Sequence, residues 1–215
     1  MAANFQERGV RSPAEIAGVD HSEMGRLPEW NLGDLYPGME SQEFLDDFKK
    51  AVPSAEKFET EYKGKLLGHL QNSGDDLARA LRDFEQQEDF LGRIVSFAGL
   101  LYAGNSSDPK RAKFYGDVQE RLTKAASHLL FFTLELNSID GHLIDQGFSN
   151  SDALNHYKPW LIDLRKDKPF QLDDKIEQLF LEKSATGRSA FNRLFDEAMS
   201  ALRFAVDGEH LAIEQ

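Results

Sequence analysis

Residues 75–103, DDLARALRDFEQQEDFLGRIVSFAGLLYA, and residues 109–140, PKRAKFYGDVQERLTKAASHLLFFTLELNSID, decide the fold of this chain. In each stretch, large residues recur at steps of four and three, which aligns them along one side of a helix. The turn between them supplies Gly104, an Asp108 N-cap and Pro109 at the first helical position. The sequence therefore predicts a long antiparallel helical hairpin from Asp75 to Asp140. Its two series are Leu77, Leu81, Phe84, Glu88, Leu91, Val95, Ala98 and Tyr102, and Val118, Leu122, Ala125, Leu129, Phe132, Leu136 and Ile139.

The segments around this hairpin also carry helical signals. Ser41 is a predicted N-cap for a helix that Pro53 should kink or divide, and Pro159 should bend a later helix. Two further amphipathic helices are predicted, one starting at Asp173 and one led by Ser189. We therefore predict a mainly α fold, a multi-helical bundle built on the long hairpin.

The beginning of the chain differs from this pattern. Residues 1–26 lack periodicity, and we interpret them as a flexible leader. The segment Leu27–Gly38 contains two prolines, which exclude a continuous helix, together with Trp30, Leu32, Leu35 and Tyr36. These side chains are too apolar to stay in water, so the segment is predicted to be a strap docked on the bundle.

The end of the chain changes to a period of two. Leu202, Phe204 and Val206 alternate, and Asp207–Gly208 is a strong signal for a short β-hairpin. A two-stranded hairpin is marginal alone, so its apolar face needs a cover. We expect residues 27–215 to be one helical domain that is truncated before the rest of a larger protein. Apolar surface left uncovered would promote self-association.

Composition narrows the classes of function. The formal net charge is −12, which disfavours nucleic acid and anionic membranes as partners. There are no cysteines, which excludes disulfides and thiolate chemistry. The first residues carry no apolar secretory signal, and no apolar run approaches the ~18 residues that span a bilayer. The expectation is a soluble, cytoplasmic protein.

The sequence carries no familiar catalytic or metal-binding motif. None of the six histidines forms a His-Glu-x-x-His or Glu-x-x-His pattern, and no phosphate-binding loop or nucleophile elbow is present. We therefore predict no catalytic, cofactor-binding or metal-binding residue in this chain.

Two residues nevertheless stand out. Glu88 interrupts the apolar series of the first long helix, and His128 lies beside Leu129 of the second. A buried carboxylate can mark a functional site, but we favour a structural interpretation of Glu88. In that interpretation its carboxylate pairs with Arg or Lys of a neighbouring helix, or it lies where the apolar seam opens. For His128 we favour a satisfied boundary histidine over a ligand. The acidic run 85–89 is interpreted as a solvated face.

Three passages resemble one family of enzymes. LPEWNLGDLYP at Leu27–Pro37 resembles the opening W-(D/N)-L-x-D-L-Y-P of the oligoendopeptidase F family, among the thimet-oligopeptidase-like zinc metallopeptidases. SFAGLLYAGN at Ser96–Asn105 is similar to a long-helix segment of that family, and FNRLFDE at Phe191–Glu197 looks like its W-x-R-L-F-D-E helix. Phe191 in place of the tryptophan is a departure. The resemblance covers residues 27–215.

The resemblance implies a mostly helical enzyme with a deep channel, in which zinc hydrolyses short peptides. His-Glu-x-x-His holds that zinc in the family and lies hundreds of residues further on, so no catalytic or metal residue transfers to this chain. The expected role is a non-catalytic N-terminal domain that forms a wall of the channel, with the catalytic domain and short peptides as partners. The chain alone is expected to be inactive.

Two other functions remain open from the sequence. The chain could be a free-standing helical module that binds a partner protein through its hairpins. It could also be an enzyme with a dispersed site around Glu88. A peptide-cleavage assay with added zinc separates the last interpretation from the first two.

Overall fold

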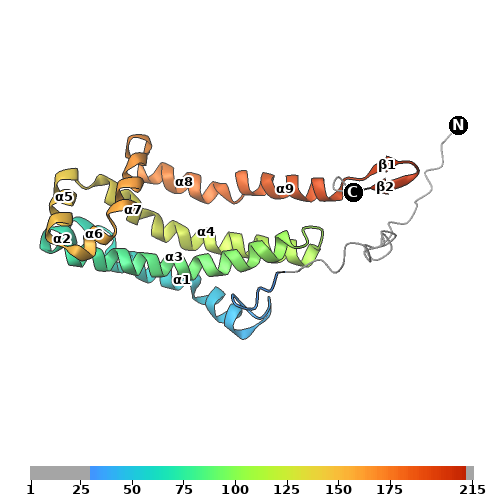
Figure 1. The fold of residues 1–215 in the computed structure, drawn as a ribbon, viewed down its shortest axis with the longest axis horizontal. Helices are drawn as coiled ribbons and strands as arrows, with labels where there is room; N and C mark the ends of the chain where they lie inside the picture. Colours follow the sequence, from blue (N-terminus) through green and yellow to red (C-terminus); the bar gives the residue numbers. More distant parts are fainter. Residues whose placement is uncertain (1–29, 212–215) are drawn as a thin grey trace. The chain divides into compact units, whose positions relative to one another are not determined.

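The computed structural model describes residues 30–211, and the leader predicted at residues 1–26 lies outside them. By contacts the chain divides into residues 1–31 and residues 32–215, and the described helices and strands belong to the second unit. This unit is mainly α-helical with a small antiparallel sheet, as predicted (Figure 1). Its elements are α1 (Gln42–Tyr62), α2 (Leu66–Asn72), α3 (Gly74–Ala103), α4 (Pro109–Ser138), α5 (Gly141–Asn150), α6 (Asp152–His156), α7 (Lys158–Leu164), the 3₁₀ helix η1 (Arg165–Phe170), α8 (Asp174–Ser184), α9 (Arg188–Ala201), β1 (Phe204–Val206) and β2 (Glu209–Leu211).

The predicted long hairpin is confirmed in α3 and α4. The Ser73 hydroxyl caps the start of α3, and the Asp108 carboxylate accepts a hydrogen bond from the amide of Lys110 at the start of α4. Capping satisfies amides that have no partner within the helix. Every member of the predicted α4 series, from Val118 to Ile139, is buried.

Helix α1 packs against both arms of this hairpin and completes the core. Aromatic rings fill the space between the three helices; the main contacts join Tyr36, Phe44, Phe97 and Phe114 at one end, and Phe58, Phe84, Phe131 and Phe132 at the other. The Arg121 guanidinium of α4 donates to the carbonyls of Phe48 and Lys49, at 2.6 and 3.0 Å. Pro53 lies inside an undivided α1, so of the two predicted outcomes, a kink or a division, the division does not occur.

The prediction of a strap at Leu27–Gly38 is confirmed in part, and its residues 27–29 lie outside the described residues. The backbone turns at Leu32–Tyr36, where the amides of Leu35 and Tyr36 donate to the Leu32 carbonyl. Tyr36 is buried, and its hydroxyl donates to Asp47 at 3.0 Å. Leu32 and Leu35 pack against the core, whereas Trp30 is 75% exposed.

The prediction that Glu88 occupies the buried seam of α3 is wrong. Glu88 is exposed, and Gln87 takes the seam position, where its side-chain amide donates to the Ser54 hydroxyl of α1 at 2.7 Å. The same shift by one residue exposes Val95 and buries Ile94 in its place. A strict seven-residue repeat drifts by about 20° per heptad relative to a straight α-helix, which moves the buried side by one residue.

Replacing Glu88 should therefore have little effect on stability. We expect Glu88→Ala to change the free energy of unfolding by less than about 0.5 kcal/mol, as for most surface substitutions. Gln87→Ala removes the hydrogen bond that Ser54 accepts, while the Ser54 hydroxyl still donates to the Ala51 carbonyl, and should cost about 1 kcal/mol. Urea titrations of the two variants measure the difference, and a larger loss from Glu88→Ala would contradict the observed register.

The short helices α5–α7 close one end of the bundle through close contacts. The Ser151 hydroxyl caps α6 and also donates to the Asp75 carboxylate at the start of α3, at 2.5 Å. Pro159 lies in the first turn of α7, so the predicted bent helix is two separate helices. Arg165 donates to the carbonyls of Leu136 and Ile139, which satisfies acceptors at the end of α4.

The predicted β-hairpin is confirmed as β1 and β2. Phe204 pairs with Leu211 and Val206 with Glu209. Asp207 and Gly208 both have positive φ, at 51° and 88°, which suits the tight turn that an Asp-Gly pair favours.

Candidate functional site

The helices α8 and α9 and the hairpin that follows them expose an apolar surface, which we call the apolar face. No residue of α8 or α9 is buried. The members of the apolar face are between 36% and 79% exposed; they are Phe170, Leu172, Ile176, Leu179, Phe180, Phe191, Leu194, Phe195, Met199, Leu202, Phe204 and Val206. The spacing of Phe191, Leu194, Phe195 and Met199 places them along one side of α9. Exposed apolar patches of this extent mark interaction sites.

Polar side chains occupy the other side of these helices, toward α4. Arg193 of α9 donates to the side-chain carbonyl of Gln119 on α4. Gln178 and Glu182 of α8 line a cleft shared with α4. These helices therefore turn mainly polar side chains toward the bundle and most of their apolar side chains away from it, although Met199 borders a cavity beside Tyr102.

Two cavities lie between α4 and the α8–α9 pair. One has a volume of about 800 Å³ and is bounded by residues that include Glu59, His128, Glu182 and Arg193. The other, of about 930 Å³, lies at the turn between α3 and α4, next to Tyr102 and Arg193. The Tyr102 hydroxyl is buried and has no hydrogen-bond partner among residues 30–211. Arg193 borders both cavities.

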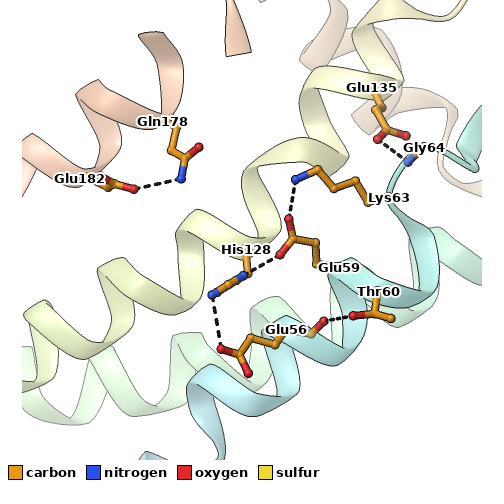
Figure 2. A network of polar contacts seen from close by, with 9 residues as sticks. All are labelled: Glu56, Glu59, Thr60, Lys63, Gly64, His128, Glu135, Gln178 and Glu182. Carbon is orange, nitrogen blue, oxygen red and sulfur yellow. Dashed lines mark hydrogen bonds and ion pairs between the residues drawn. The ribbon is translucent and has the colours of Figure 1, made fainter. Parts of the chain in front are cut away.

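A network of charged side chains lies beside the first cavity (Figure 2). His128 Nδ1 lies 2.6 Å from a Glu59 carboxylate oxygen, and His128 Nε2 lies 3.7 Å from Glu56. The Lys63 ammonium contacts the other oxygen of Glu59 at 2.5 Å. Burial alone would raise the pKa of Glu59, but the hydrogen bonds from Lys63 and His128, and their charges, hold it below its ordinary value. Both ring nitrogens of His128 thus have carboxylate partners, which agrees with the favoured interpretation of a histidine at the boundary of the core.

Glu135 on α4 ties the end of α1 to the same region. Its carboxylate accepts a hydrogen bond from the Gly64 amide at 2.6 Å (Figure 2). Burial raises the pKa of Glu135 despite this bond. Glu59 and Glu135 were not singled out from the sequence, because Glu59 and His128 lie 69 residues apart and no local pattern pairs them.

The network should give a stability that depends on pH. The folded-state pKa of Glu59 is lowered, so its contribution is present above the unfolded value of about 4.3 and is lost as pH falls through the folded value. We expect Glu59→Gln to cost about 1 kcal/mol at pH 7 and nothing once the pH lies well below the lowered pKa of Glu59. The matched control, Glu120→Gln, removes an exposed ion pair with Lys124 and should change little. Equal losses for both variants at pH 7 would contradict the network.

The described residues do not fit a zinc site. Within residues 30–211, no group of three or more His, Cys, Asp or Glu side chains could hold a metal ion. Both ring nitrogens of His128 already face carboxylates, and Lys63 competes for Glu59. Glu88 lies at the exposed surface, where desolvation by neighbouring protein and then the Asp89 charge raise its pKa. No contact among the described residues joins Glu88 to His128.

No helix between residues 30 and 211 is both long enough and apolar enough to cross a bilayer.

Comparisons with known proteins identify relatives of this chain. The family model described as Oligopeptidase F matches residues 135–204, which contain all of the apolar face except Val206. Oligopeptidase PepF of Bacillus subtilis (strain 168) is 28% identical over 179 residues, which cover 80% of this chain and 25% of that protein. The chain thus spans about a quarter of the length of the curated relative it matches. No solved structure matches it. These findings support the resemblance to the N-terminal domain of the oligoendopeptidase F family, and the segment that the family model matches contains the Phe191–Glu197 passage.

Proposed function

We propose that this chain serves as the non-catalytic N-terminal domain of a zinc-dependent peptidase that hydrolyses short peptides. The observation that carries the proposal is the similarity to oligopeptidase PepF across 80% of this chain but only 25% of that protein. The helical bundle supplies a rigid body, and the apolar face supplies a surface to which the rest of such an enzyme can bind.

In this proposal the bundle forms one wall of a channel that admits short peptides. The zinc would be held by His-Glu-x-x-His in the catalytic part, where it would activate the attacking water. The residues of this chain take part by position alone, and none is assigned a catalytic step. A cytoplasmic location belongs to the same proposal and agrees with the absence of cysteine.

A chimeric enzyme tests this function. The chain replaces the matching quarter of Bacillus subtilis oligopeptidase PepF, and hydrolysis of a short internally quenched peptide is measured with zinc present. We expect the chimera to cleave the peptide and the isolated 215-residue chain to leave it intact. Robust cleavage by the isolated chain, or a folded chimera with no activity, would overturn the proposal.

A second function is favoured by the apolar face alone. A free-standing interaction module would use the same surface to bind an unrelated protein, without any peptidase. The chimera separates the two functions, because a module of that kind gives no reason for peptide cleavage to be restored.

A further inference from the structure

We propose that the apolar face is the surface through which this domain binds the remaining, catalytic part of an oligopeptidase F chain. The inference rests on the proposed function and adds to it the location of the interface. It assigns the contact to the outer side of α8 and α9 and to the β-hairpin. The cleft between α4 and α8 would then stay outside this interface.

The first argument is that the bundle itself does not cover this surface. Phe191 is 69% exposed, Leu194 58% and Phe195 63%, although their spacing is that of a buried helix face. Arg193, on the opposite side of α9, is held to α4 by Gln119. A rotation of α9 about its own axis that buried its apolar side would break this hydrogen bond and expose Arg193 to water. A cover must therefore come from outside the described fold.

The second argument comes from the β-hairpin. Phe204 is 50% exposed and Val206 47%, so the described residues leave about half of these two side chains uncovered. Between residues 30 and 211 no third strand pairs with β1 or β2. A two-stranded sheet is marginal in water, and its free edges offer backbone groups to a further strand. A partner that covers α9 and extends this sheet would satisfy both requirements together.

The third argument concerns the occupant. About three quarters of the sequence of oligopeptidase PepF lies outside its match with this chain. The segment matched by the family model, residues 135–204, ends at the hairpin. A second copy of this chain is a poorer occupant, because each copy carries a formal charge of −12 and the copies repel one another. Anionic lipid is disfavoured by the same charge. The catalytic part of the enzyme is the occupant we propose.

Coexpression tests the inference. The 215-residue chain is coexpressed with the remaining three quarters of Bacillus subtilis oligopeptidase PepF, and their complex is measured by affinity capture and light scattering. We expect Leu194→Asp to weaken capture at least ten-fold. The matched control, Leu45→Asp, alters a leucine of 45% exposure on α1 and should leave capture unchanged.

The outcomes separate the two proposals. Equal capture of both variants would overturn the assigned surface, and peptide cleavage by that complex would leave the proposed function standing. Self-association that is lost in Leu194→Asp, with no capture of the catalytic part, would overturn the inference in favour of a second copy. Capture that depends on Leu194 without peptide cleavage would support the interface and overturn the proposed function.

A second measurement applies if the coexpressed part does not fold. In the single-chain chimera, Leu194→Asp should lower the thermal unfolding midpoint by several degrees, whereas in the isolated chain it should leave the midpoint unchanged. Leu45→Asp should behave alike in both backgrounds. Equal effects of Leu194→Asp in the two backgrounds would overturn the inference.

Discussion

Replacing Phe132 by alanine should cost about 3–5 kcal/mol of unfolding free energy, the range measured for buried phenylalanines. Phe132 is fully buried in α4. Its ring stacks on Phe84 at 4.4 Å between centroids and contacts Phe58 at 5.3 Å. The substitution leaves a cavity where three helices meet, and the rigid walls can collapse only in part. Urea or thermal unfolding of the isolated chain measures the loss.

Phe195→Ala is the matched control for this prediction. It removes the same ring from a site that is 63% exposed on α9. In the isolated chain we expect a change within about 0.5 kcal/mol, as for ordinary surface positions. A loss from Phe195→Ala as large as that from Phe132→Ala would show that α9 turns its apolar side toward the bundle, contrary to the structure.

Gly74→Ala should destabilise the chain by about 1–3 kcal/mol, the usual effect of overpacking. A Cβ atom added at Gly74 would lie 2.6 Å from Ser151 Cβ and 3.2 Å from the Gly147 carbonyl oxygen. The α3 helix start and Ser151 would have to separate, which would break the bond from Ser151 to Asp75. Thermal unfolding should show the loss even though alanine favours helices.

Gly92→Ala is the control for that variant. Gly92 lies inside α3, and a Cβ atom added there meets nothing within 4 Å. We expect a gain of up to about 1 kcal/mol, since alanine forms helices better than glycine. If Gly92→Ala lowered the stability as much as Gly74→Ala, the loss would come from the substitution within the helix. That result would contradict the close approach of Gly74 to Ser151.

Local patterns in the sequence predicted much of the fold. The α4 series was correct at all positions, since every member from Val118 to Ile139 is buried. The caps at Ser41 and Asp108, and the turn at Asp207–Gly208, depend on neighbouring residues only and could be read directly.

The error at Glu88 arises because the buried side of α3 depends on contacts with a distant segment. Glu88 and Gln87 differ by one step around α3, and the choice between them is made by Ser54 on another helix. At Pro53 the sequence left a kink and a division open, and α1 runs through Pro53 undivided while it packs against α3 and α4.

The candidate site was less predictable than the fold. The apolar series of α8 and α9 was visible in the sequence, but periodicity alone does not tell which side of a helix meets the bundle. Arg193 and Gln119 settle that orientation, and they lie 74 residues apart. The pairing of Glu59 with His128 was hidden in the same way.

Hydrogen exchange at the backbone amides of α8 and α9 tests most directly whether this domain is completed by a catalytic part. The isolated chain and the chimera with Bacillus subtilis oligopeptidase PepF are compared, with α3 as the internal reference. Amides of α8 and α9 that exchange at least ten-fold more slowly in the chimera, with unchanged rates in α3, are the predicted result. Equal exchange of α8 and α9 in both proteins would contradict the account.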